Sequence, residues 1–216
     1  MTETNQIIAA LHSLLQADKA VTHRAARHRD KPLAKAVGWA AELADEPQLL
    51  TLSVVTAAVG LATGRRDVAR AGARMLAAHL VAIGAKSVLK HTIDRSRPKH
   101  ALETGEERFE PGTSDDHQQQ SFASGHTAGM MAVTRAAAHE IDGMALPGMV
   151  ATAAVAAAQP FAGNHYVTDV VAGAVIGLVA EALVGVAFDR WTWGEDANPL
   201  SNSSIENDLG RGNHVE

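Results

Sequence analysis

SFASGHTAGMMAVTRAAAHE, residues 121–140, joins a short polar segment to a run of small and apolar residues. Ser124 is a typical N-cap residue, so we expect a helix from Ser124 to Glu140. The free N–H groups of a helix N-terminus suit a phosphate anion, and Gly125 lets the backbone approach a ligand closely. His126 in the first turn can donate a proton to a leaving-group oxygen. Taken alone, the segment also fits an ordinary cap followed by a surface histidine.

Apolar runs elsewhere in the chain predict further helices around this one. Alternating patterns of β-branched residues are too short to predict a sheet. Alanine, glycine and valine supply much of the apolar content, and small residues let helices pack closely. We therefore expect an all-α bundle of five to six core helices. The remaining expected helices are Pro47 to Gly64, Val68 to Lys90, Met144 to Phe161, Tyr166 to Asp189 and a weaker one within Pro32 to Ala44.

Composition divides the chain into one domain and two flanking segments. Residues 1–31 form an N-terminal arm, with an amphipathic helix near Ile7 to Leu15 and a basic run from His23 to Lys31. That run suits either a solvated surface or contact with anionic lipid head groups. Residues 32–190 form the helical bundle, and residues 191–216 form a polar tail that we expect to be disordered. A long polar loop is expected from Lys99 to Gln120.

The hydropathy of the helices favours a membrane protein, although the signals conflict. Pro47 to Gly64 and Gly143 to Asn164 carry no charged residue and are long enough to span a bilayer. The mean hydropathy of −0.04 is low for a polytopic membrane protein. Positive charge at residues 65–70 would mark a cytoplasmic end, whereas the basic arm would then lie outside.

Charge and cysteine content exclude several classes of function. The formal net charge of −5 argues against a general nucleic-acid-binding protein, which needs a basic surface. The sequence has no cysteine, so disulfides, thiolate zinc sites and cysteine nucleophiles are excluded.

Two further motifs stand at expected helix ends. Lys90 and Arg97 bring two cations near the end of one helix, and Pro98 stops its continuation. Arginine can grip phosphate oxygens with two hydrogen bonds. His165 and Asp169 are four residues apart at the start of the last helix, so the carboxylate could fix the imidazole tautomer. Alone, these motifs also suit a basic cluster at a membrane surface and a helix-stabilising pair.

The three motifs together resemble the type 2 phosphatidic acid phosphatase superfamily, which also includes bacterial acid phosphatases and vanadium haloperoxidases. The family pattern is Lys-x6-Arg-Pro, then Pro-Ser-Gly-His, then Ser-Arg-x5-His-x3-Asp. Ala123 replaces the proline of the second motif. Ala158 and Gln159 stand where the third motif has Ser-Arg. The resemblance covers roughly Pro47 to Asp189, and helix alternation predicts that all three motifs meet at one end of the bundle.

The resemblance implies a metal-independent phosphatase with no cofactor that forms a phosphohistidine. His165 would be the nucleophile, Asp169 would orient it, and His126 would protonate the leaving oxygen and later activate water. The phosphate would be bound by Lys90, Arg97, Ser124, Gly125 and Gln159. The substrate would be a phosphorylated lipid (phosphatidic acid, phosphatidylglycerophosphate or undecaprenyl diphosphate) or a small phosphoester. The expected location is a bacterial-type cytoplasmic membrane, with the active site facing outward.

Gln159 is the main departure, because a fixed positive charge is missing there. The loss of one such donor can cost about 10²–10³ in rate. Arg95, Lys99 or Arg108 could compensate. The alternative functions are a non-catalytic phosphate- or lipid-binding relative, a vanadium-dependent haloperoxidase and a structural membrane bundle. The last of these leaves the three motifs unexplained.

Overall fold

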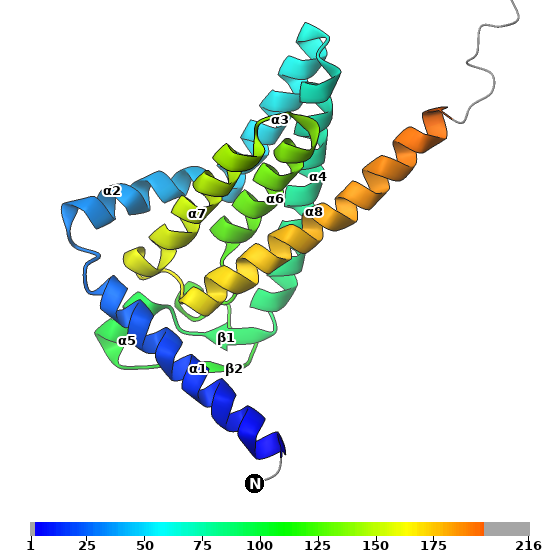
Figure 1. Ribbon diagram of the computed structural model, residues 1–216. Helices are drawn as coiled ribbons and strands as arrows, with labels where there is room; N and C mark the ends of the chain where they lie inside the picture. The colour runs from blue at the N-terminus through cyan, green and yellow to red at the C-terminus, as the bar shows by residue number, and fades with distance from the viewer. Residues whose placement is uncertain (1–2, 197–216) are drawn as a thin grey trace, which may run out of the picture.

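The computed structural model describes residues 3–196 and confirms the expected all-α helical bundle (Figure 1). The elements in chain order are α1 (Glu3–Ala26), α2 (Pro32–Ala41), the 3-10 helix η1 (Glu42–Ala44), α3 (Glu46–Thr63), α4 (Arg66–Lys90), β1 (Ile93–Arg95), α5 (Pro98–Thr104), β2 (Phe109–Pro111), the 3-10 helix η2 (His117–Gln119), α6 (Gly125–Glu140), α7 (Ala145–Ala162) and α8 (Val167–Asp196).

Local signals set the helix ends close to their expected positions. The Ser124 hydroxyl caps α6 and accepts a hydrogen bond from the backbone N–H of Thr127 at 3.4 Å. Gly64 and Gly163 end α3 and α7 with positive φ angles of 68° and 71°, a conformation that glycine adopts without strain. At its end, α8 continues to Asp196, beyond the expected Asp189. The first residues of the expected tail are therefore helical, and residues 197–216 lie outside the described residues.

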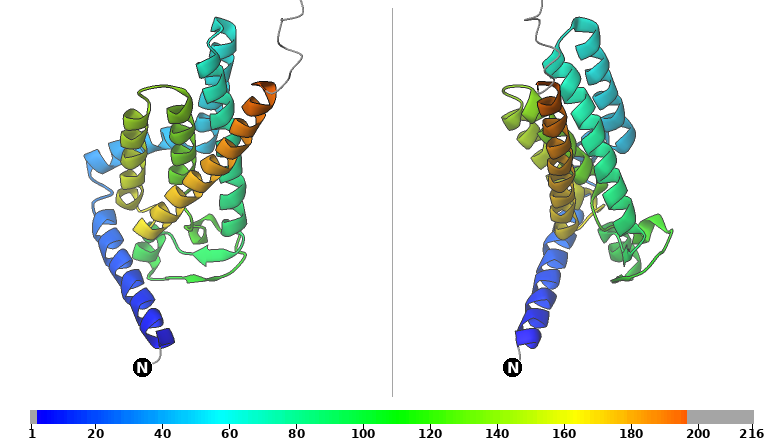
Figure 2. Two further views of the ribbon diagram at one scale, coloured as in Figure 1. Left: turned by 45° about the vertical axis from the view of Figure 1, so that its right-hand side comes forward. Right: turned by 90° about the vertical axis from the view of Figure 1, so that its right-hand side faces the viewer.

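Three helices form the centre of the bundle. Helices α4, α6 and α8 pack against one another, α3 packs on α4, and α7 packs on α6. Helix α2 crosses α7 on the outer side (Figures 1 and 2). This order returns the chain to one end of the bundle at the end of α4, the start of α6 and the start of α8.

The connection between α4 and α6 has more structure than the expected loop. It contains α5, η2 and two short antiparallel strands in which Asp94 pairs with Glu110. The Asp94 carboxylate also accepts a hydrogen bond from the backbone N–H of Ser114 at 2.9 Å. Each strand has three residues, so no alternating pattern could reveal it in the sequence.

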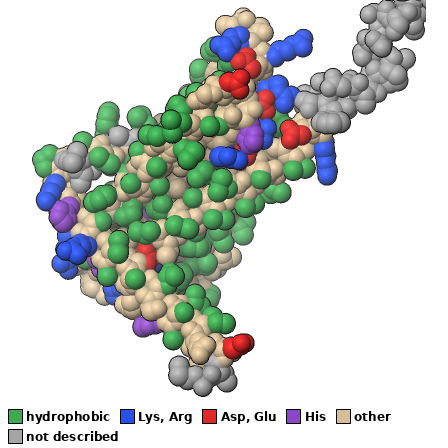
Figure 3. Space-filling view, viewed as in Figure 1, with side chains coloured by type: hydrophobic (Ala, Val, Ile, Leu, Met, Phe, Trp, Pro, Cys, Tyr) green, Lys and Arg blue, Asp and Glu red, His purple; other side chains and the backbone are tan. Residues whose placement is uncertain are grey.

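The outer surface of the bundle is strongly apolar. Large aliphatic side chains point outward along α3, α7 and α8, and Figure 3 shows apolar side chains spread over the face in view. Exposed aliphatic side chains along three helices suit the hydrocarbon of a bilayer. The exposed residues on these helices include Leu52, Val55, Leu61, Leu146, Met149, Val150, Val171, Val175, Val179 and Leu183.

The interior, in contrast, is built from small and polar residues. Alanines make up most of the packed core between α4, α6 and α8. Among them, buried Arg74 donates hydrogen bonds to Glu181 at 2.5 Å and to Glu140 at 3.1 Å. Small residues and paired charges inside, with aliphatic residues outside, are typical of helices packed in a membrane.

Within residues 3–196, three helices are long and apolar enough to cross a membrane: Arg66–Lys90, Ala145–Ala162 and Val167–Arg190. Of the two segments that we expected to be the clearest spans, only the second is among them. Helix α3 begins at Glu46 and includes Gln48, and these two polar residues lower the hydropathy of the helix. Helix α4 is apolar enough even though it contains Arg74, His79 and Lys86, because alanine, leucine, valine and other apolar residues dominate the rest of it.

The N-terminal arm is a long helix rather than a short amphipathic segment. In its second half, Asp18, Thr22 and Ala26 are buried against the body of the protein. Its first half projects beyond the end of the bundle, where Ile7 and Leu11 are exposed (Figure 2). The arm therefore packs against the bundle through only part of its length.

We predict that the contact between α3 and α4 tolerates no added methyl group at Gly72. A Cβ there would lie 2.1 Å from the backbone nitrogen of Ala57, so Gly72→Ala should destabilise the bundle by about 2 kcal/mol. Gly84→Ala on the same helix is the control, because its Cβ would meet nothing within 4 Å. Thermal unfolding in detergent should show a lower midpoint for Gly72→Ala alone. Equal midpoints for the two variants would contradict the close packing.

Candidate active site

A cavity of about 340 Å³ lies at the end of the bundle where the three motifs meet. Lys90 comes from the end of α4, Arg97 precedes α5, Gly125 and His126 begin α6, and His165 precedes α8. The cavity is lined by Glu42, Asp45, Glu46, Lys86, Lys90, Arg97, Lys99, His117, Gly125, His126, Asn164 and His165. We name it the catalytic cavity.

Four cationic side chains line the catalytic cavity. Lys90 and Arg97 belong to the first motif, while Lys86 lies one helical turn before Lys90, and Lys99 lies in α5. Arg97 is buried and donates a hydrogen bond from Nε to the carbonyl of His117 at 3.0 Å. This fixed guanidinium and the three lysines make the cavity suitable for an anion with several oxygens.

The start of α6 forms one wall of the catalytic cavity. Gly125 lines it, and a Cβ there would lie 2.9 Å from Cδ of Lys86. Ser124 is fully buried behind this wall and caps the helix, so its side chain is not among the lining groups. The structure thus gives Ser124 a role in shaping the anion site through the backbone of the next residues.

His165 is held in one tautomer by a backbone group. Its Nδ1 donates a hydrogen bond to the carbonyl oxygen of Ser121 at 2.7 Å, and a carbonyl can only accept. The lone pair is therefore on Nε2. The ring is buried, and its centroid lies 6.5 Å from that of His126.

Asp169 does not bond His165 directly, in contrast to the expected pairing. Its Oδ2 lies 3.9 Å from Nδ1 of His165 and instead accepts hydrogen bonds from the hydroxyl of Ser121 at 2.6 Å and the backbone N–H of Tyr166 at 2.9 Å. The reason is that His165 stands before the first turn of α8, so the four-residue spacing is not a helical turn. Asp169 is therefore connected to the imidazole only through Ser121, whose hydroxyl binds Asp169 and whose carbonyl binds His165.

Arg95 holds this arrangement together from outside the catalytic cavity. Its guanidinium donates hydrogen bonds to the carboxylates of Asp169 and Asp18, the latter at 2.9 Å. It also lies over the ring of Tyr166, 4.1 Å from the centroid. Arg95 and Arg108 are not among the residues that line the catalytic cavity, so of the three proposed substitutes for the missing arginine only Lys99 is suitably placed.

His126 forms an ion pair with a residue outside the three motifs. Its Nε2 lies 2.7 Å from Oδ1 of Asp45, the residue that joins η1 to α3. The neighbouring Glu46 pairs with Lys86 in the same way from the first turn of α3. Acidic side chains thus fix both a histidine and a lysine of the catalytic cavity.

The two histidines both have lowered pKa values. Burial lowers the pKa of His165 well below 6.5, and the charges of Arg97 and His126 lower it further. Burial also lowers the pKa of His126, while Asp45 opposes this by stabilising the protonated ring. At neutral pH His165 is therefore neutral, which leaves its Nε2 free to attack an electrophile.

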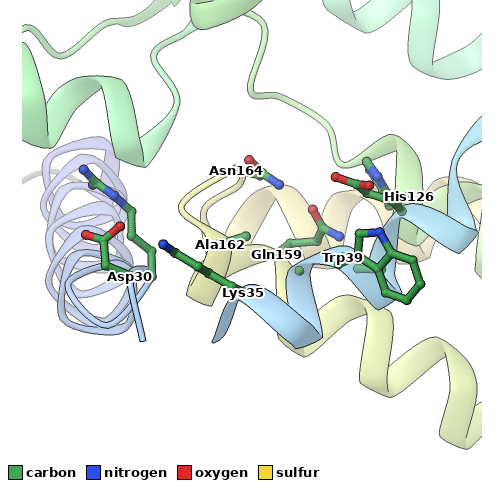
Figure 4. A pocket seen from close by; sticks show the side chains of 11 residues that line it. Asp30, Lys35, Trp39, His126, Gln159, Ala162 and Asn164 are labelled. Carbon is green, nitrogen blue, oxygen red and sulfur yellow. The ribbon is translucent and has the colours of Figure 1, made fainter. Parts of the chain in front are cut away.

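Gln159 lies away from the catalytic cavity, although we had expected it to bind phosphate. It lines an adjoining cavity of about 320 Å³, which Figure 4 shows, together with Arg29, Asp30, Lys35, Gly38, Trp39, Ala41, Glu42, His126, Ala162 and Asn164. Glu42, His126 and Asn164 line both cavities. A glutamine is shorter than an arginine, so it does not reach across to the anion site.

Sequence reasoning missed several residues of this site. Lys86 was not among the predicted phosphate-binding residues, and its spacing of one helical turn from Lys90 was the available signal. None of the family motifs quoted above includes Asp45, His117 or Asn164. Asp45 lies far from His126 in the sequence, so only the packing of α3 beside α6 brings them together.

Comparisons with known proteins agree with this geometry. A family model described as the PAP2 superfamily matches residues 71–193, more than half of the chain. A crystal structure of a transmembrane PAP2 type phosphatidylglycerolphosphate phosphatase from Bacillus subtilis is similar, with 22% identity, a TM-score of 0.61, and coverage of 84% of this chain and 90% of that one. Aquifex aeolicus LpxE has 18% identity, a TM-score of 0.54, and coverage of 76% and 92%. No curated protein sequence matches the chain.

We predict that Asp45→Asn lowers the pKa of His126 further. The carboxylate is the neighbour that favours the protonated ring, so its removal leaves burial and the nearby cations unopposed. Titration of the histidine ring carbons by NMR measures the shift. Glu42→Gln is the matched control, because Glu42 lines the same cavity without contributing to the pKa of His126. An unchanged pKa in Asp45→Asn would show that the ion pair is not formed in solution.

Proposed function

The chain belongs to the PAP2 superfamily, and on that premise we propose that it is a lipid phosphatase that acts through a phosphohistidine. The observation that carries the proposal is that His126 and His165 line one cavity together with four cationic side chains. The centroid distance of 6.5 Å between the rings of His126 and His165 leaves a phosphoryl group within reach of both.

In the first step, Nε2 of His165 attacks the phosphorus atom. The hydrogen bond from Nδ1 to the Ser121 carbonyl keeps the lone pair on Nε2, and the lowered pKa keeps the ring neutral. A nitrogen–phosphorus bond forms while the bond from phosphorus to the leaving oxygen breaks. His165 becomes positively charged, and Asp169 acts on it through Ser121.

The cationic side chains stabilise the charge on the phosphoryl oxygens during transfer. Lys90 and Arg97 are joined by Lys86 and Lys99, which together replace the charge that Gln159 lacks. The backbone N–H of Gly125 at the start of α6 adds a fixed donor. Phosphoryl transfer depends mainly on such positioned charge, and these side chains supply it without a metal ion.

His126 acts as the general acid in the first step and as the general base in the second. The Asp45 carboxylate favours its protonated form, and a protonated ring carries a second N–H, at Nδ1, for the leaving oxygen. In the second step the neutral ring takes a proton from water, and the water oxygen attacks the phosphohistidine. Phosphate is released, and both histidines return to their initial states.

The distribution of charge supports an outward-facing catalytic cavity. The turn between α3 and α4 lies at the opposite end of the bundle and carries Arg65 and Arg66. Positive residues beside membrane spans favour the cytoplasmic side. The substrate would then be a lipid in the outer leaflet, such as phosphatidic acid, phosphatidylglycerophosphate or undecaprenyl diphosphate.

We expect His165→Ala to lose at least about 10³-fold in turnover on a lipid phosphate, because the variant lacks the nitrogen that would take the phosphoryl group. Detergent-solubilised protein should hydrolyse the substrate in the presence of EDTA. The wild-type protein should yield a phosphoenzyme that is labile to acid and stable to base. Unchanged turnover in the variant would refute the mechanism, and a protein that binds lipid phosphate without forming a phosphoenzyme would be a non-catalytic relative.

The pH dependence of kcat/KM should reflect the protonation of the His126 ring. The ring must be protonated to serve as the acid, and its pKa in the free enzyme is below 6.5. We therefore expect kcat/KM to fall as the pH rises through the acidic range, with a midpoint below pH 6.5 once the titration of the substrate is taken into account. Asp45→Asn should move this midpoint to lower pH. A midpoint above pH 7 would contradict this assignment.

A further inference from the structure

The cavity beside the catalytic cavity is not explained by phosphoryl transfer alone. Its walls come from α2, η1 and α7, and three of its lining residues also line the catalytic cavity. We propose that this cavity is a leaving-group subsite for a hydroxyl-bearing group, so that the substrate is a phosphorylated polyol or sugar. This inference rests on the proposed function.

The position of His126 carries the first part of the argument. His126 lines both cavities, and the proposed mechanism places the leaving oxygen beside this histidine. If the phosphoryl group occupies the cationic cavity, the leaving oxygen lies at the junction. The remainder of the leaving group then extends into the cavity of Figure 4.

Gln159 gives the second, independent observation. Its side chain is 1% exposed and lines the adjoining cavity, and its Oε1 has no hydrogen-bond partner among the described residues. An unpaired buried carbonyl of this kind costs about 1–3 kcal/mol unless a ligand or water satisfies it. A hydroxyl group of the leaving group is a donor of the required kind.

The other lining groups match a polyol rather than a plain alkyl chain or a second phosphate. Lys35 and Arg29 supply donors, whereas Asp30 and Glu42 supply acceptors, so the cavity has both signs of charge. Asn164 offers both a donor and an acceptor. Such mixed groups suit hydroxyls, which donate and accept at once.

Trp39 completes the subsite at its rim. It lines the cavity from α2, is 71% exposed, and lies close to His126 in Figure 4. An indole face packs well against the C–H groups of a polyol or sugar. The position of Trp39 therefore favours a leaving group with both hydroxyl and C–H faces.

The test compares two pairs of phosphate monoesters in which the leaving group of one member carries a hydroxyl group that the other lacks. The lipid pair also differs by a phosphodiester, so its preference is assigned to the subsite only through the variants. The soluble pair is glycerol 3-phosphate and propyl phosphate, and the lipid pair is phosphatidylglycerophosphate and phosphatidic acid in detergent micelles. We expect wild-type kcat/KM to favour the hydroxyl-bearing member by about tenfold in at least one pair. Preference in the soluble pair indicates a free phosphorylated polyol, and preference confined to the lipid pair indicates a lipid-linked one.

Variants then assign the preference to the subsite. Gln159→Leu should reduce the preference several-fold, and Trp39→Ala, a change at an exposed position, should reduce it without disturbing the fold. Gln48→Leu is the matched control, because Gln48 is exposed and lines neither cavity. The ratio of kcat/KM within a pair is compared between each variant and the wild type, so differences in the intrinsic reactivity of the esters cancel.

The possible failures are distinguishable. Equal kcat/KM within both pairs, or a preference that survives Gln159→Leu and Trp39→Ala, would overturn the subsite and leave the phosphatase proposal intact. An absence of hydrolysis of all four esters and of undecaprenyl diphosphate would overturn both proposals.

Discussion

The site depends on one buried ion-pair group. Arg95 donates to the carboxylates of Asp169 and Asp18, and all three side chains are buried. Breaking a buried pair by removing one partner costs about 3–5 kcal/mol, because an uncompensated charge is left behind. Through this group α1, β1 and α8 are fixed relative to one another. Asp169 then holds Ser121, and the carbonyl of Ser121 sets the tautomer of His165.

The bundle around this group has its polarity reversed relative to a soluble protein. Aliphatic side chains cover the outside of α3, α7 and α8, while alanines and paired charges fill the inside. The cations of the catalytic cavity lie at the end of these helices, where phosphate can approach from water. This division lets one protein hold apolar chains along its sides and bind a phosphate at its end. The membrane-embedded fold and the phosphate chemistry are thus two consequences of the same arrangement.

The sequence predicted what local signals determine. The cap at Ser124 and the glycines after α3 and α7 set helix ends, and helix alternation brought Lys90, His126 and His165 to one end of the bundle. Contacts between distant segments were not predictable. The ion pair of Asp45 with His126 depends on how α3 packs, and the three-residue strands are too short for a pattern. The spacing of His165 and Asp169 was misinterpreted because α8 begins at Val167.

The contacts of Arg95 with both Asp18 and Asp169 also show which segments of the chain form one structural unit. The family match begins at residue 71, and composition alone would separate residues 1–31 as an appendage. Asp18 nevertheless supplies one of the two carboxylates around Arg95, and it also accepts a hydrogen bond from the backbone N–H of Thr168 at 3.1 Å. The folded unit is therefore larger than the segment that the family model matches, and a version lacking α1 would lose one of the two carboxylates that bind Arg95, together with the acceptor of the Thr168 N–H at the start of α8.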